Sequence, residues 1–188
     1  KVLIEIATKS GEIREIDLER RSVDLRPVRT KRLRDDSHTI GYLRITQFSE
    51  SVPKKVEEAL QELKDKEVEG VILDLRNNSG GLVSSGIAVA NSFLNAKPVV
   101  ETKDRNGIKD AIISEEYTSF DGPMVTLVNK GTASASEILA GSLQDNGRST
   151  LIGEQTYGKG LIQSLKSLGE ESGIAITVAS YLTPKGNN

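Results

Sequence analysis

The chain has 188 residues, of which 25 are basic and 27 acidic, so its net charge is −2; 28% of the residues are charged and 36% are hydrophobic. This balance gives no reason to expect nucleic acid or an anionic membrane as a partner, and the absence of cysteine excludes disulfides, thiolate catalysis and cysteine-bound metals. No apolar run reaches the roughly 18 residues that a membrane-spanning helix needs.

The first part of the chain is typical of a β-hairpin. Residues 1–6 have the composition of a strand, Gly11 interrupts the pattern, and apolar residues then recur from Ile13 to Val23. We expect this hairpin to lack the partners that would cover its apolar side chains.

The single histidine, His38, follows in a charged stretch that begins at Arg34. A zinc site built from several histidines therefore cannot form within this chain, and a Ser-His-Asp triad would have to use His38. Lone histidines are most often ordinary surface or turn residues, and we expect His38 to be one. A hydrolase built from this chain would need a different general base.

The remainder of the chain alternates between strand and helix patterns. Val52, Val56, Ala59, Leu60 and Leu63 recur at helical spacing, with Pro53 in the first turn of the predicted helix. Helices are predicted at residues 51–66, 82–94 and 134–145. Strands are predicted at residues 39–48, 71–75, 99–102, 108–113, 124–128, 151–153, 161–165 and 174–181. This alternation predicts an α/β layer fold with a largely parallel central sheet.

In such folds the reactive groups gather at the carboxyl ends of the parallel strands. Residues 77–81, Asn-Asn-Ser-Gly-Gly, leave one buried strand and enter a helix. Their backbone N–H groups could face an anion beside the helix N-terminus, as an oxyanion hole or a phosphate cradle. A tight turn with a helix cap accounts for the same residues, so this loop alone leaves both interpretations open.

The second strand-to-helix loop leads to Ser134. Ser134 and Glu137 fit the S-x-x-E capping box, and a capping serine needs no further role. Small neighbours nevertheless leave the hydroxyl room to meet a substrate, and a nucleophile at a helix N-terminus lies where developing negative charge is stabilised. From the loop alone the two interpretations are equally good.

A third loop, residues 153–160, nearly matches the phosphate-binding pattern G-x-x-x-x-G-K-[ST]. Nucleotide binding is disfavoured because position 160 is glycine, which has no hydroxyl for Mg²⁺, and because residues 161–165 are typical of a strand. What remains is Lys159 between two glycines. A lysine can act as a general base when burial without a counter-ion leaves its amine neutral.

Together, residues 71–82, 129–138 and 153–163 resemble the carboxyl-terminal processing proteases, the tail-specific Ser/Lys peptidases of bacteria and chloroplasts. The three segments follow the family's order and spacing, and the resemblance covers most of the chain from about Ile40 onward. It implies a core similar to the crotonase and Clp-protease type of α/β superhelix.

The resemblance also implies the roles of individual residues. Ser134 corresponds to the family's nucleophile, Lys159 to its general base, and Gln163 to the glutamine that orients the lysine. The oxyanion donors correspond to the backbone amides of Gly80 and Ala135. If residues 159–163 were fully extended, the Cα atoms of Lys159 and Gln163 would lie about 13 Å apart, so a bend near Gly158 or Gly160 is expected.

The activity implied is endopeptidase cleavage near the C-terminus of a protein or peptide with a free, apolar C-terminus, through an acyl-enzyme. No metal, organic cofactor, nucleotide or nucleic acid is expected to take part. The resemblance also implies a location outside the cytoplasm, in the periplasm or the thylakoid lumen.

The family normally carries a PDZ domain before this core. We therefore interpret residues 1–24 as the closing strands of a PDZ domain and residues 25–188 as a protease core truncated at its C-terminal end. A truncated or inactive protease-like module that binds or scaffolds partners remains the alternative.

Overall fold

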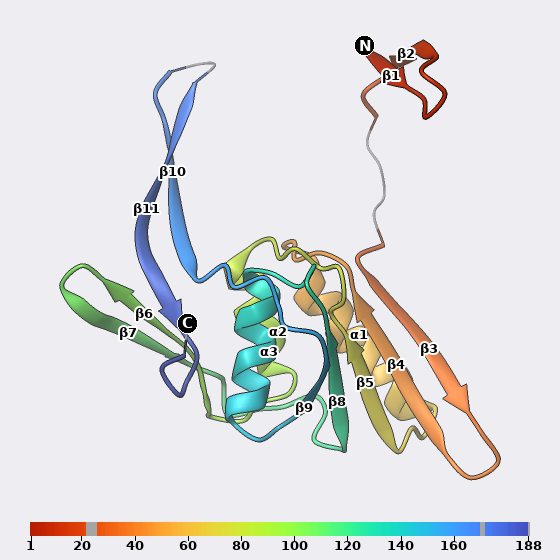
Figure 1. Ribbon diagram of the computed structural model, residues 1–188. Helices are drawn as coiled ribbons and strands as arrows, with labels where there is room; N and C mark the ends of the chain where they lie inside the picture. The colour runs from red at the N-terminus through yellow and green to blue at the C-terminus, as the bar shows by residue number, and fades with distance from the viewer. Residues whose placement is uncertain (22–25, 170–171, 188) are drawn as a thin grey trace.

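The computed structural model describes residues 1–21, 26–169 and 172–187. At its centre is a five-stranded sheet with strand order β3-β4-β5-β8-β9 (Figure 1). Its strands are β3 (Val28–Arg34), β4 (Thr39–Ile45), β5 (Gly70–Asp74), β8 (Met124–Val128) and β9 (Thr150–Gly153). β4, β5, β8 and β9 run parallel, whereas β3 pairs antiparallel with β4. The predicted α/β class is confirmed, and the central sheet is mixed.

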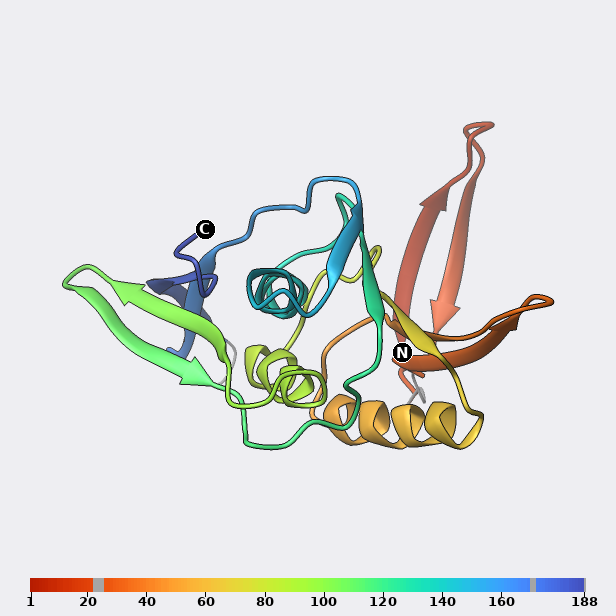
Figure 2. The same ribbon diagram turned by 90° about the horizontal axis from the view of Figure 1, so that it is seen from below.

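Three helices connect the parallel strands, as parallel pairing requires. They are α1 (Val52–Asp65), α2 (Val83–Asn91) and α3 (Ala135–Asp145). Seen from below, all three gather on one side of the five-stranded sheet (Figure 2). None of the helices in the described part of the chain is both long and apolar enough to cross a membrane.

The core lies between this sheet and the helices. Burial alternates along β4, where Leu43 and Ile45 are fully buried and their neighbours Tyr42 and Arg44 are partly exposed. All five apolar residues that predicted α1 are buried, as their spacing indicated: Val52, Val56, Ala59, Leu60 and Leu63. Leu139 of α3 belongs to the same cluster, so the helix that follows Ser134 is fixed by core packing.

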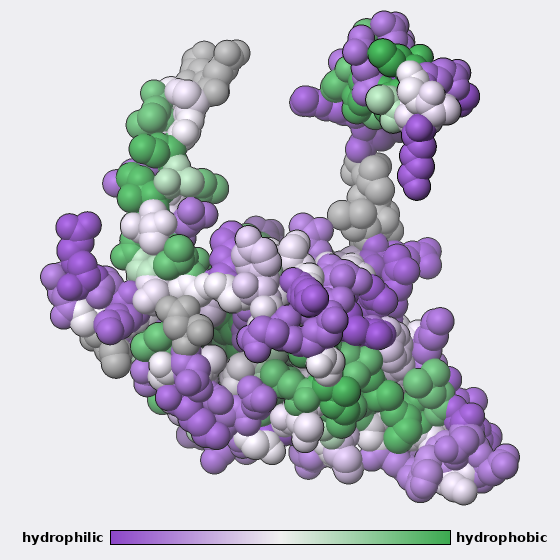
Figure 3. Space-filling model, in the orientation of Figure 1, coloured by the Kyte–Doolittle hydropathy of each residue, from purple (hydrophilic) through white to green (hydrophobic). Residues whose placement is uncertain are grey.

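A second, four-stranded sheet has the order β10-β11-β6-β7. Its strands are β6 (Pro98–Asp104), β7 (Gly107–Ile113), β10 (Leu161–Ser167) and β11 (Gly173–Leu182). The β10–β11 hairpin extends away from the body of the molecule, and much of its visible surface is hydrophobic (Figures 1 and 3). Leu165 of β10 is 83% exposed.

β1 (Val2–Ala7) and β2 (Ile13–Leu18) form the predicted N-terminal hairpin and, among the described residues, pair only with each other. Their large apolar side chains, among them Leu3 and Ile13, are exposed. The predicted boundary between residues 24 and 25, like Val23, lies outside the described residues. The assignment of residues 1–24 to a PDZ domain stays a prediction.

The sequence analysis did not predict β3. Its residues, Val-Arg-Thr-Lys-Arg-Leu-Arg, lack the apolar alternation of a half-buried strand, and most of them are exposed. The strand forms because β4 offers a free edge with which its backbone pairs along the whole length. An edge strand tolerates charged side chains that a central strand would exclude.

Candidate active site

The three loops that the sequence singled out follow the carboxyl ends of β5, β8 and β9, and the structure brings them together. The amide of Ala133 donates to the carbonyl oxygen of Asn78 at 3.0 Å, which joins the first loop to the second. The amide of Tyr157 donates to the carbonyl oxygen of Thr132 at 3.0 Å, which joins the third. One edge of the sheet thus collects all the predicted site residues except Gln163, which lies on β10.

Side-chain hydrogen bonds fix the first two loops further. Asn77 and Asn129 are joined twice, because Asn129 Nδ2 donates to Asn77 Oδ1 at 2.9 Å and the Asn77 amide donates to Asn129 Oδ1 at 2.8 Å. The Thr132 hydroxyl donates to the carbonyl oxygen of Leu75 at 2.9 Å. Asn78 is fully buried and donates through Nδ2 to the Ile45 carbonyl oxygen.

Gly80 lies directly against Ser134 and Ala135. Its φ is +98°, and a Cβ placed on it would lie 2.8 Å from Ser134 Cβ and 3.1 Å from the Ala135 nitrogen. Only glycine fits this position without displacing the helix N-terminus. The Gly80 amide, predicted as an oxyanion donor, donates here to Asn78 Oδ1 at 2.9 Å. The Ala135 amide opens α3, where a helix provides no acceptor of its own.

Ser134 has a strained backbone, with φ 58° and ψ −121°. The Ser136 amide donates to the Ala133 carbonyl oxygen at 3.2 Å, which places Ser134 at the first central position of a tight turn of the type that normally requires glycine there. A non-glycine residue in such a conformation costs on the order of 1–3 kcal/mol and is typical of functional sites. No sequence pattern had indicated this strain.

The two alternating serines differ in what their hydroxyls can do. Ser136 is fully buried, and its hydroxyl donates to the Asn78 carbonyl oxygen at 3.0 Å. Ser134 is only partly buried. The structure therefore leaves Ser134, and not Ser136, placed to meet a substrate.

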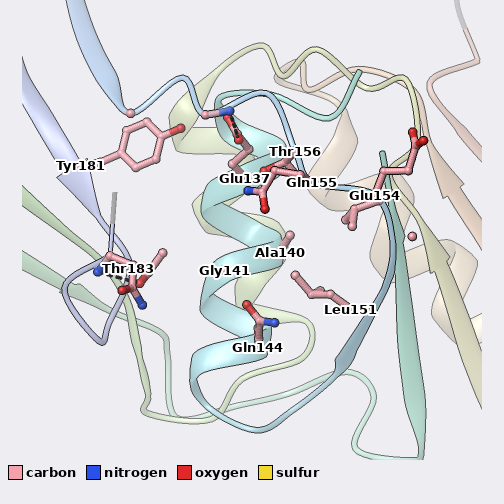
Figure 4. Close-up of a pocket in the computed structure, with 15 residues that line it drawn as sticks. Glu137, Ala140, Gly141, Gln144, Leu151, Glu154, Gln155, Thr156, Tyr181 and Thr183 are labelled. Atoms are coloured by element: carbon pink, nitrogen blue, oxygen red, sulfur yellow. Dashed lines mark hydrogen bonds between the residues drawn. The ribbon is translucent and has the colours of Figure 1, made fainter. Parts of the chain in front are cut away.

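Glu137 links α3, the helix that begins after Ser134, to the third loop. Its Oε2 accepts the amide of Ser134 at 2.8 Å, which is the glutamate half of the predicted capping box. The same carboxylate accepts the amides of Gly158 at 2.6 Å and Lys159 at 2.9 Å. Figure 4 shows Glu137 reaching from α3 toward this backbone. The capping pattern had identified Glu137, but not its bonds to the loop of Lys159.

Tyr181 of β11 reaches the same loop from the other side. Its buried hydroxyl donates to the carbonyl oxygen of Lys159 and lies 3.4 Å from that of Ser134. Its amide donates to the Gly160 carbonyl oxygen at 3.1 Å. Burial raises the pKa of Tyr181, and the nearby Glu137 carboxylate raises it further. No sequence signal had pointed to this tyrosine.

The side chains of Lys159 and Gln163 are both exposed. Among the hydrogen bonds and ion pairs of the described residues, none joins the Lys159 amine to Ser134 or to Gln163. Gly158 has a positive φ of 84°, and the strand register shifts between Ile162 and Gln163. A cavity of about 580 Å³ lies here, and its lining includes Ser79, Ala133, Lys130, Lys159 and Leu161.

Asp74, at the carboxyl end of β5, anchors the start of the first loop. The carboxylate is fully buried, lies 2.8 Å from Arg76 Nη2, and accepts the Arg76 amide at 2.9 Å and the Tyr42 hydroxyl. Burial opposes its ionisation, but hydrogen bonds from the Arg76 and Tyr42 side chains outweigh that effect and lower the pKa of Asp74 to about 2. Asp74 therefore remains an anion inside the fold.

Other groups are poorly placed for chemistry at this site. His38 precedes β4, at the end of the parallel strands opposite to Ser134, and its exposed ring contacts Glu69 at 2.9 Å, which raises the pKa of His38. This agrees with the surface role expected for it. Residues 161–167 after Lys159 form a strand, as predicted, and not the helix of a phosphate-binding loop. In the part of the chain that the structure describes, no three acidic or histidine side chains cluster to hold a metal.

Comparison with known proteins adds independent information. A profile of peptidase family S41 matches residues 39–188. A carboxyl-terminal-processing protease of Synechocystis is 47% identical over 98% of this chain and 44% of its own length. The chloroplastic carboxyl-terminal-processing peptidase 2 of Arabidopsis thaliana is 41% identical over 96% of this chain and 37% of its own length.

Among solved structures, a photosystem II D1 C-terminal processing protease superposes with a TM-score of 0.81 at 37% identity. The match covers 95% of this chain and 49% of that protein. The chain thus spans less than half the length of each of these relatives.

Proposed function

Since the chain belongs to peptidase family S41, we propose that the protein is a serine endopeptidase in which Ser134 is the nucleophile and Lys159 the general base. One observation carries this proposal. Ser134 is held in a strained turn at the N-terminus of α3, and Glu137 of the same helix binds the backbone of Lys159. The Ser134 hydroxyl and the loop that carries Lys159 thus lie together at the N-terminus of α3.

The proposed reaction is acyl transfer. The neutral amine of Lys159 takes the proton of the Ser134 hydroxyl, and the oxygen attacks the carbonyl carbon of the scissile peptide bond. The amides of Gly80 and Ala135 stabilise the oxyanion, and Lys159 passes its proton to the leaving amine as the C–N bond breaks. Lys159 then takes a proton from a water molecule, which attacks the acyl carbon, and returns that proton to the Ser134 oxygen as the ester C–O bond breaks. No metal or organic cofactor enters this sequence.

Two rearrangements belong to the proposal. The Lys159 side chain, exposed in this structure, must turn toward Ser134, where Gln163 orients it, when a peptide fills the adjacent cavity. The Gly80 amide must turn from Asn78 Oδ1 to the substrate's oxyanion. The first is a rotation of one side chain, and the second is a local turn of the peptide group that carries the Gly80 amide.

The substrate class follows from the relatives. Proteins named for carboxyl-terminal processing are similar to this chain over nearly its whole length. We propose a protein or peptide substrate with a free, apolar C-terminus, cleaved near that end. Because the relatives are cyanobacterial and chloroplastic, we propose an extracytoplasmic location, and we assign residues 1–24 to a PDZ domain that receives the substrate's C-terminus.

Cleavage of an unfolded protein with an apolar C-terminus tests the proposal. Ser134→Ala and Lys159→Ala in the full-length protein should each abolish turnover, while circular dichroism shows an unchanged fold. Lys166→Ala removes an exposed lysine farther along β10 and should leave cleavage unaffected. Full cleavage by both active-site variants would end the proposal.

A second candidate function is a protease-like module that binds protein chains without cutting them. The side chains of Lys159 and Gln163 are exposed and form no hydrogen bond with Ser134 among the described residues, which favours this function. Under this alternative the unmodified protein would bind the unfolded substrate and leave it intact, and the Ser134→Ala variant would bind equally well.

A further inference from the structure

The backbone of residues 158–160 is bound on both sides by residues of other elements. From α3, the Glu137 carboxylate accepts the amides of Gly158 and Lys159. From β11, the hydroxyl of Tyr181 donates to the carbonyl oxygen of Lys159, and the Tyr181 amide donates to that of Gly160. The peptide group on each side of the Lys159 Cα therefore has a fixed partner.

These bonds are strong for physical reasons. Hydrogen bonds from backbone N–H groups to a carboxylate are charge-assisted and exceed neutral ones in strength, and Glu137 receives three of them. The carboxylate also lies in the first turn of α3, where the helix dipole favours negative charge. Tyr181 is only 5% exposed, so a hydroxyl without a partner there would be costly.

The same two side chains also contact the nucleophile. Glu137 accepts the Ser134 amide, and the Tyr181 hydroxyl lies 3.4 Å from the Ser134 carbonyl oxygen. In Figure 4 the tyrosine ring points toward the end of α3 at which Glu137 lies. The backbones of Ser134 and Lys159, which are distant in the sequence, are thus bound by the same two side chains.

We propose that Glu137 and Tyr181 are positioning residues that hold the Lys159 backbone at a fixed place relative to Ser134, so that the amine reaches the hydroxyl by side-chain rotation alone. This inference rests on the proposed function. It assigns to β11, a strand without any predicted site residue, a direct part in placing the general base. It also explains why the backbone is ordered around a lysine whose side chain is exposed.

Tyr181→Phe in the full-length protein isolates the hydroxyl, since phenylalanine keeps the ring and the backbone bond to Gly160. We expect kcat on an apolar-tailed fluorogenic peptide to fall between about 10-fold and 100-fold, with KM nearly unchanged, because a displacement of about 1 Å at a reacting group costs that much. The ascending limb of the pH profile of kcat/KM should move to higher pH, since a more solvated amine keeps its proton to higher pH. Charged groups beside Lys159 are Glu137 on α3 and Lys130, which lines the same cavity.

Glu137 provides a graded test. Glu137→Gln keeps one acceptor oxygen but turns a donor toward the amides, and Glu137→Ala removes every acceptor. Turnover should therefore decrease from the unmodified protein to the Gln variant and again to the Ala variant. Amide hydrogen exchange of Gly158 and Lys159 should accelerate in the same order, and this readout does not depend on activity.

Leu60→Ala serves as the control for a merely structural effect. Leu60 is fully buried in α1, a helix that contains none of the proposed site residues, so this variant should lower the unfolding temperature without moving the pH limb. The inference is overturned if Tyr181→Phe and Glu137→Ala leave the pH limb in place, or leave the Gly158 and Lys159 amides protected, while Ser134→Ala remains inactive. If Ser134→Ala itself still cleaves, it is the proposed function that fails.

Discussion

Ser134 and Lys159 lie on segments that the fold holds in different ways. Around Ser134, backbone and side chains are both fixed, by the paired Asn77 and Asn129, the buried Asn78 and the core of α3. Around Lys159, Glu137 and Tyr181 fix the backbone while the side chain extends into solvent. The difference teaches that the proposed nucleophile is preorganised, whereas the proposed base would need a change of side-chain conformation.

The largest expected effect on stability comes from replacing two glycines with alanine, Gly80 beside Ser134 and Gly158 beside Lys159. Gly80→Ala would place a methyl group 2.7 Å from the Ala133 carbonyl oxygen, whereas Gly158→Ala meets nothing within 4 Å. Both positions have positive φ, so both variants are strained. Urea unfolding should show a loss of roughly 3 kcal/mol for Gly80→Ala and roughly 1 kcal/mol for Gly158→Ala. Equal losses would contradict the difference in packing between the two sides.

Acid should lower the stability of the fold around Ser134 by protonating Asp74. The pKa of its buried carboxyl is lowered from 3.8 to about 2 in the fold, so the stability it contributes is present above the unfolded value and is lost as the pH falls from about 4 toward 2. The loss amounts to about 2 kcal/mol. The free energy of unfolding, measured across this pH range, should fall more steeply for the unmodified protein than for Asp74→Asn. Parallel curves would show that Asp74 does not contribute in this way.

Because the backbone of Ser134 is strained, replacing this residue with glycine is expected to increase stability. With φ at 58° and ψ at −121°, Ser134→Gly should raise the free energy of unfolding by about 1 kcal/mol while abolishing cleavage. Ser134→Ala keeps the Cβ and should show no such gain. A Gly variant less stable than the Ala variant would mean that the turn is not strained.

The smallest effect on stability is expected for Gln163. Its side chain is exposed, so Gln163→Ala should change the free energy of unfolding by less than about 0.5 kcal/mol. Turnover should nevertheless fall on the order of 10-fold, because the proposed role of Gln163 begins only when Lys159 turns toward Ser134. Unchanged turnover would remove Gln163 from the site.

The fold was largely predictable because its elements are strongly patterned. The apolar spacing of Val52 to Leu63 in α1 and the nearly continuous apolar β5 and β8 each produced the expected element. β3 escaped prediction because its stability comes from pairing with β4 and not from its own side chains. Burial patterns read from a sequence cannot reveal an edge strand that buries almost nothing.

The site was predictable only in part. The chemistry of the residues alone did not decide whether Ser134 is a helix cap or a nucleophile, or whether Lys159 is an ordinary lysine or a general base. The resemblance to a family implied a catalytic role for each. The hydrogen bonds of Tyr181 join segments far apart in the sequence, and the strained turn at Ser134 packs against Gly80 of another loop. Such contacts depend on how the strands are ordered in space, which local spacing does not encode.

The charged strand β3 has a consequence for self-association. It closes one edge of the five-stranded sheet, and its outer side displays unpaired backbone groups that a second copy could recruit. Arg29, Lys31, Arg32 and Arg34 would meet their own counterparts across such a junction, and like charges brought that close repel. The strand should therefore keep concentrated protein from polymerising through sheet extension at this edge.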